Sequence, residues 1–132
     1  MRPPDPGSIP VARRARQVTE KPLMATGGFK TLTQACDAVS SGTVDLVGIA
    51  RGLALCPDLP ALWGRGQQTA PAFPRFDAPP EGGVTAWYTM RLTAIGEDRA
   101  TLDPGPLETA INLYAARDRD RTRIWRSHFT GP

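Results

Sequence analysis

The sequence predicts an α/β fold built around one βαβ unit. Two short apolar runs, residues 21–29 and 44–51, have the composition of parallel strands that are covered on both faces. Between them lies an amphipathic segment with helical spacing, long enough for a crossover connection. We therefore expect two adjacent parallel strands whose following loops lie side by side.

Length, composition and charge narrow this architecture further. The chain has 132 residues, which is one domain at most and about half of the residues of a complete (β/α)₈ barrel. Its 14 prolines and 13 glycines exceed average usage, so part of the chain must be loop or tail. The net charge of +3 is mild and predicts no nucleic-acid partner.

The distribution of cysteines and apolar residues predicts a cytoplasmic protein. Cys36 and Cys56 lie apart, without metal-ligand spacing, as in reducing compartments. The longest apolar run, residues 46–55, is broken by Arg51 and is too short to cross a bilayer, so we expect no membrane partner. The first residues have no apolar stretch of the secretory kind.

Four segments follow from these patterns. Residues 1–10 contain four prolines and are expected to form a disordered tail. Residues 11–66 hold the β/α units and begin with a short amphipathic helix at Val11. Residues 67–83 form a proline-rich linker, and residues 84–132 form a helical C-terminal extension.

The helix between the two strands has a recognisable start. Thr31 and Gln34 have the spacing of a capping box. In this motif the Thr31 hydroxyl accepts a hydrogen bond from the Gln34 amide, and the Gln34 side chain reaches back to the amide at the start of the helix. One apolar stripe follows, made of Leu32, Ala35, Cys36 and Val39. Because Cys36 lies on that stripe, we expect a packed thiol rather than a reactive one.

Two further apolar stripes predict helices near the C-terminus. The first contains Tyr88, Leu92 and Ile95, and the second contains Leu107, Ala110, Ile111 and Tyr114. Residues 117–123 then alternate arginine with polar or acidic residues, which is typical of a solvated helix end. A contact with phosphate or with an acidic partner remains the alternative for these arginines.

Candidate binding residues follow each predicted strand. Gly27 and Gly28 lack a Cβ, so the backbone can turn sharply there and approach a ligand closely. Arg51, which follows Ala50, adds a fixed positive charge and a fork of donors suited to phosphate. These four residues predict a phosphate cradle at neighbouring strand ends. The alternative is a tight turn beside a surface arginine.

The predicted phosphate cradle differs from two known phosphate-binding motifs. Gly27 and Gly28 do not form the G-x-G-x-x-G fingerprint of dinucleotide sites, and no Walker-type Gly-Lys-Ser/Thr occurs. In (β/α)₈ barrels, phosphate is commonly bound by the loops after the last two strands. The predicted cradle has that placement if these are the last two strands of such a barrel.

Four motifs in this order carry a family resemblance: Ala12-Arg-Arg-Ala-Arg16, Lys21-Pro-Leu-Met-Ala-Thr-Gly-Gly-Phe-Lys-Thr31, Asp45-Leu-Val-Gly-Ile-Ala-Arg51 and Pro57-Asp-Leu-Pro60. Through them, residues 11–66 resemble the C-terminal portion of the Old Yellow Enzyme family of FMN-dependent NAD(P)H:flavin oxidoreductases. Residues 84–116 are similar, less distinctively, to the tail of some members. The resemblance implies a partial TIM (β/α)₈ barrel, made of the last two β/α units and C-terminal helices.

The resemblance also implies a cofactor and a reaction. FMN would take a hydride from NAD(P)H and pass it to an activated alkene or similar acceptor. Carried over by position, Gly28 would donate its amide to the FMN phosphate, and Gly27 would shape the loop. Ala50 would contribute backbone at the same phosphate, where the family commonly has glycine, and Arg51 would neutralise it.

Other family features are missing from this sequence. The flavin-ring contacts, the paired His/Asn substrate clamp and the proton-donating tyrosine come from earlier barrel strands, so we assign no catalytic residue. We expect a C-terminal fragment that is inactive alone and that associates through exposed strand edges. Two other functions remain open: a barrel end for a sugar or nucleotide phosphate, and a non-catalytic interaction module whose arginine-rich tail binds an acidic partner.

Overall fold

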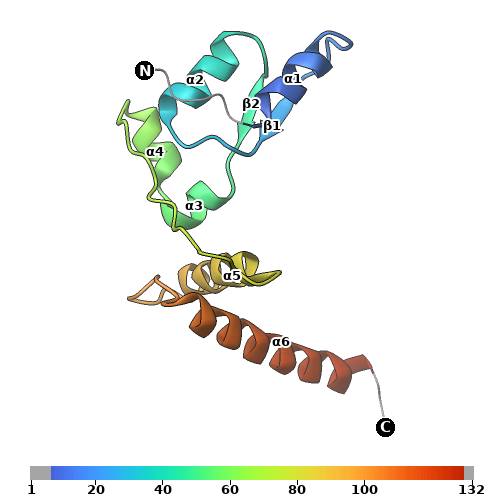
Figure 1. Cartoon of the computed structure of the whole chain (residues 1–132), viewed down its shortest axis with the longest axis vertical. Helices are drawn as coiled ribbons and strands as arrows, with labels where there is room; N and C mark the ends of the chain where they lie inside the picture. The colour runs from blue at the N-terminus through green and yellow to red at the C-terminus, as the bar shows by residue number, and fades with distance from the viewer. Residues whose placement is uncertain (1–6, 130–132) are drawn as a thin grey trace. The chain divides into compact units, whose positions relative to one another are not determined.

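The computed structural model describes residues 7–129 and divides the chain into two compact units, Met1–Phe73 and Pro74–Pro132. We call them the N-terminal unit and the C-terminal unit. The elements, labelled in Figure 1, are α1 (Ile9–Arg16), β1 (Met24–Thr26), α2 (Leu32–Ser40), β2 (Leu46–Gly48), α3 (Arg51–Leu55), α4 (Leu59–Gly64), α5 (Gly83–Gly96) and α6 (Leu107–Phe129). The predicted tail lies outside the described residues for positions 1–6, and the first helix begins at Ile9, before Val11.

The predicted fold class, an α/β partial TIM (β/α)₈ barrel, is wrong. Helices make up 53% of the described residues, and the two strands have three residues each. The described chain therefore has far too little strand for barrel units, which close only with about eight strands. Both apolar runs are longer than the strands they produce, because Gly27 turns the chain out of β1 and α3 begins at Arg51, soon after β2.

The sheet itself is parallel, as the βαβ pattern predicts. Met24 lies opposite Leu46, and Thr26 lies opposite Gly48. The inner face carries Ala25 and Val47, which pack with a cluster contributed by α1, α2 and their flanking loops: Ile9, Ala12, Phe29, Ala38 and Val44. Helices thus cover one face of this sheet.

The other face of the sheet is open. Met24 is 66% exposed and Leu46 is 58% exposed, and the two are cross-strand partners. Parallel sheets normally bury both faces. The prediction of strands covered on both sides therefore holds for only one side within the described residues.

The connecting helix α2 begins as predicted but packs differently. Thr31 accepts a hydrogen bond from the Gln34 amide (3.2 Å), and the Gln34 side chain accepts one from the Lys30 amide (2.9 Å). Cys36, however, is exposed, and the prediction of a packed thiol is wrong. The stripe on α2 is wider than the surface that α1 and the sheet offer it, since Val39 is exposed as well.

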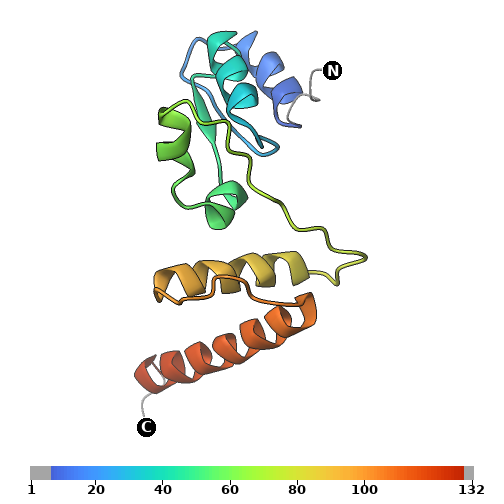
Figure 2. The same cartoon turned by 90° about the vertical axis from the view of Figure 1, so that its left-hand side faces the viewer.

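The C-terminal unit is a pair of helices with a returning loop. Figure 2 shows α5 and α6 running in the same direction, with the loop between them folding back along α5. Trp87 donates its indole N–H to the Gly105 carbonyl (3.1 Å), and Arg91 donates to the Leu102 carbonyl (3.2 Å), so both fasten the loop to α5. A Cβ added at Gly83 would lie 3.3 Å from Ile111 of α6, which brings the two helix starts together.

Within residues 7–129, none of the helices has the length and apolar character that crossing a bilayer demands.

Candidate functional site

The loop after β1 turns through two glycines in the left-handed region. The φ angles are 105° at Gly27 and 86° at Gly28, which side chains with a Cβ rarely adopt. A Cβ added at Gly27 would have no atom within 4 Å, so glycine is required here for backbone conformation rather than for space. A Cβ on Gly27 would therefore project into open space.

Ser8 fixes the orientation of this loop. Its hydroxyl donates to the Gly27 carbonyl (2.8 Å) across 19 positions of sequence. Because a trans peptide directs its C=O and N–H in opposite directions, the Gly28 amide points away from Ser8. The loop therefore presents the Gly28 N–H on the side opposite α1. No local sequence motif marks Ser8 as part of this site.

The second half of the site follows β2. Since Thr26 and Gly48 are partners in register, the two strands end at the same level, and residues 27–28 and 49–51 leave the sheet at the same edge. Ala50 is the N-cap residue of α3, and Arg51 is its first residue; both are exposed. The structure thus brings the four predicted residues Gly27, Gly28, Ala50 and Arg51 to one edge of the sheet.

Gly48 keeps the strand ends close together. A Cβ at this position would lie 2.0 Å from the Thr26 hydroxyl oxygen, a distance that no side chain could tolerate without a shift. Only glycine lets Thr26 lie against β2 at this point. The sequence motif around Arg51 contains this glycine, but its partner across the sheet could not be assigned from the sequence.

Asp45 holds the opposite end of the same two strands. Its carboxylate accepts a hydrogen bond from the Leu23 amide (2.7 Å) and pairs with the Arg16 guanidinium of α1. The Leu23 amide, and after it Arg16, lowers the pKa of Asp45 below its ordinary value of 3.8. Arg16 is therefore a link between α1 and the sheet.

Lys30 adds a second cation near the glycine loop, but its side chain is engaged within the unit. Its ammonium lies 5.5 Å from the centre of the Phe73 ring, a cation–π distance. Phe73 comes from the predicted proline-rich linker and thereby fastens that segment to the N-terminal unit. Arg51 is the other cation at the strand ends and lies in the first turn of α3.

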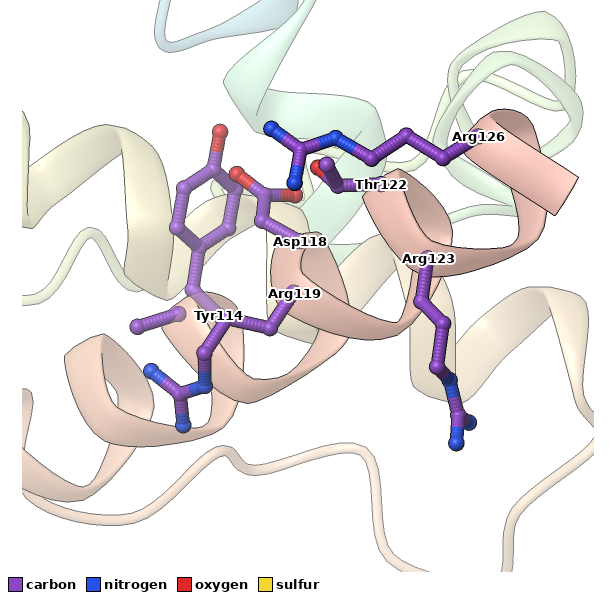
Figure 3. Close-up of a pocket in the computed structure, with 7 residues that line it drawn as sticks. Tyr114, Asp118, Arg119, Thr122, Arg123 and Arg126 are labelled. Carbon is purple, nitrogen blue, oxygen red and sulfur yellow. The ribbon is translucent and has the colours of Figure 1, made fainter. Parts of the chain in front are cut away.

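The chemistry available at the strand ends is anion binding. A backbone amide and a guanidinium are both donors suited to phosphate oxygens. No group of histidine, cysteine or acidic residues in the described part of the chain could hold a metal ion. A separate hollow of about 660 Å³ lies on α6, lined by Tyr114, Ala115, Asp118, Arg119, Thr122, Arg123 and Arg126 (Figure 3).

Comparison of this chain with protein-family models, curated proteins and solved structures finds no match.

Proposed function

We propose that this chain binds the phosphate of FMN at the ends of β1 and β2. The observation that carries the proposal is the register of the sheet, which places the Gly28 amide loop and Arg51 at one edge. Ser8 supports it by turning the Gly28 N–H away from α1. The choice of FMN among phosphate ligands comes from the resemblance to flavin oxidoreductases described above.

The binding chemistry follows from the charge of the ligand. The phosphate of FMN is a dianion, and hydrogen bonds to a charged group contribute about 1.5–3 kcal/mol each. Arg51 can offer two parallel N–H donors to such a group, which lysine cannot. Gly28 can offer an amide without a Cβ to obstruct the approach.

In this proposal the chain is the FMN-binding C-terminal part of an NAD(P)H:flavin oxidoreductase. It supplies the phosphate end of the cofactor site. Hydride transfer from NAD(P)H through FMN to an activated alkene needs catalytic groups that this sequence does not contain, so the chain alone is inactive. We place the protein in the cytoplasm, which the free thiols of Cys36 and Cys56 support.

The test is a calorimetric titration of the full chain with FMN, with riboflavin and with glucose 6-phosphate, each in a separate experiment. FMN should bind, and riboflavin, which lacks the phosphate, should bind at least about tenfold more weakly. Arg51→Ala should weaken FMN binding by about tenfold or more. Arg65→Ala is the matched control, because Arg65 is an exposed arginine of the same unit, at the end of α4.

Each other outcome has a meaning. Equal affinity for FMN and riboflavin would contradict the proposal that the site binds the phosphate group. Glucose 6-phosphate binding as tightly as FMN would favour the alternative, a site for a sugar or nucleotide phosphate. Oxidation of NADPH by the FMN-loaded chain in the presence of an enone would contradict the proposal that the chain is inactive alone.

A further inference from the structure

The second half of α6, residues 117–129, is a helix with an exposed surface. We call it the distal segment. Every side chain from Asp118 to Phe129 is exposed, whereas Ala110 in the first half is completely buried against its own unit. The segment has almost four turns, so it is long enough to present a continuous face.

One part of this surface is apolar. Ile124, Trp125 and Phe129 are 54%, 57% and 70% exposed. Trp125 and Phe129 stack on each other, with ring centres 5.1 Å apart and planes at 30°. We call Trp125 and Phe129 the aromatic patch, because residues four apart share a helix face, whereas Ile124, next to Trp125, projects from a different side. Large aromatic side chains left in water are typical of surfaces that bind a protein partner.

The rest of the surface is strongly basic. The distal segment holds two aspartates, Asp118 and Asp120, and five arginines: Arg117, Arg119, Arg121, Arg123 and Arg126. Three of the arginines, Arg119, Arg123 and Arg126, lie within about two turns of the helix and all line the hollow on α6. We call this set the arginine stripe.

The arginine stripe borders the hollow on α6. Figure 3 shows Tyr114, Asp118 and Thr122 along the same helix, with Arg126 extending back over them and Arg123 directed to the other side. Arg123 pairs with Asp120 at 3.2 Å, but both side chains are mostly exposed, so this ion pair is weak and can be exchanged for another. The surface thus combines the exposed aromatic patch with arginines whose weak ion pairs can be replaced by pairs with a partner's carboxylates.

We propose that the distal segment binds an acidic amphipathic helix of a partner protein. The aromatic patch packs against the apolar stripe of that helix, and the arginine stripe faces carboxylates that flank it. Charge complementarity carries this choice, because the net positive charge of the segment repels a second copy of itself. Helices that pair in this way use apolar residues for affinity and flanking charges to choose the partner.

The composition of the surface also favours a protein over a phosphate polymer or an anionic membrane. Asp118 and Asp120 lie within the arginine run, where they would repel a continuous row of phosphates. Ile124 is aliphatic and offers nothing to the stacking of bases. A helix with separate glutamates can place its charges opposite arginines and avoid both aspartates.

The experiment titrates the full chain into a fluorescein-labelled acidic peptide and follows anisotropy. The probe is a heptad peptide of about three repeats, with leucine at its core positions and glutamate beside them. Two matched peptides carry lysine or glutamine in place of glutamate. We expect binding of the glutamate peptide alone, and about tenfold weaker binding when salt rises from about 50 mM to about 300 mM.

Two variants separate the two parts of the surface. Trp125→Ala with Phe129→Ala should weaken binding by about tenfold or more, because buried aromatic anchors dominate such contacts. Replacing Arg119, Arg123 and Arg126 with glutamine should weaken binding and flatten its salt dependence. The control replaces the exposed Arg14, Arg65 and Arg75 with glutamine, which changes the net charge equally and should leave binding intact. Circular dichroism checks that α6 stays helical.

Three results would overturn the proposal. The first is no binding of the glutamate peptide, or equal binding of the lysine peptide. The second is tighter binding of a thymidine oligonucleotide or of vesicles containing phosphatidylserine. The third is a sedimentation measurement that shows a dimer of the chain lost in the aromatic variant, since a second copy would then occupy the face.

Discussion

The two units of this chain hold their structure in different ways. The buried cluster of the N-terminal unit mixes three alanines with Ile9, Phe29 and Val44 from separate elements and loops, and polar contacts fasten its loops. The C-terminal unit buries large side chains of one helix, among them Trp87, Tyr88 and Met90. Stability is therefore distributed over many weak contacts in the first unit and concentrated in a few large ones in the second.

The largest effect is expected from Trp87→Ala in the C-terminal unit. Trp87 is 7% exposed, contacts the rings of Phe76 and Tyr88 edge-on, and donates a hydrogen bond to Gly105. Its loss should destabilise this unit by about 3–5 kcal/mol, because a cavity and an unpaired carbonyl remain. Hydrogen exchange of peptides from α5 measures the effect, and peptides from α2 should be unchanged.

The matched control is Trp125→Ala in the same unit. Trp125 is mostly exposed, so its removal should change stability by less than about 0.5 kcal/mol. Equal destabilisation by the two substitutions would show that the unit does not concentrate its stability in the buried face of α5.

The contrast also shows what the sequence could predict. The capping box at Thr31 and Gln34 is encoded within four residues, and the structure confirms the bond from the Gln34 amide to the Thr31 hydroxyl, while the Gln34 side chain accepts from the Lys30 amide, one residue before the cap. Periodicity likewise placed helices at α2, α5 and the start of α6. It indicates which residues share a face but not whether another element covers that face. The exposed Cys36 on α2 and the open outer face of the sheet follow from this limit.

The candidate site was predictable in part for the same reason. The glycine pair and Arg51 are local signals at strand ends, and parallel pairing brings them to one edge. The contacts that hold the site, Ser8 with Gly27 and Arg16 with Asp45, join residues far apart in sequence. No motif encodes such pairs, and short apolar runs do not reveal how many strands a sheet has, which is why the barrel prediction failed.

In the N-terminal unit, Gly28→Ala should have an intermediate effect. The residue has a φ of 86°, where a Cβ costs about 1–2 kcal/mol. We expect a loss of that size in urea unfolding, together with weaker FMN binding because the loop shifts. Gly64→Ala in α4 is the control, since Gly64 has ordinary φ and open space, and alanine should stabilise the helix slightly. A neutral Gly28→Ala would contradict a loop fixed in the left-handed region.

A smaller loss is expected for Thr31→Ala, which removes the cap of α2. Its hydroxyl accepts from the Gln34 amide at 3.2 Å, and an N-cap of this kind contributes about 1 kcal/mol. Thr31→Ser keeps the oxygen and should retain most of the stability. If alanine and serine destabilised the unit equally, the methyl group rather than the capping hydrogen bond would be responsible.

The smallest effect, and the one that tests distributed stability most directly, is the pH dependence contributed by Asp45. The Leu23 amide and then Arg16 hold the pKa of Asp45 below 3.8 in the folded chain, so the folded state binds its proton less readily than the unfolded state. The contribution of Asp45 to stability is therefore fully present above pH 3.8 and is lost as the pH falls through the lowered pKa.

Asp45→Asn should be less stable than the parent chain at pH 7, and the melting temperatures of the two chains should converge as the solution becomes more acidic. Because the carboxylate is half exposed, the difference should also be small and should shrink with added salt. A gap between the two chains that persists unchanged to acidic pH would mean that the Asp45 contacts act through shape rather than charge.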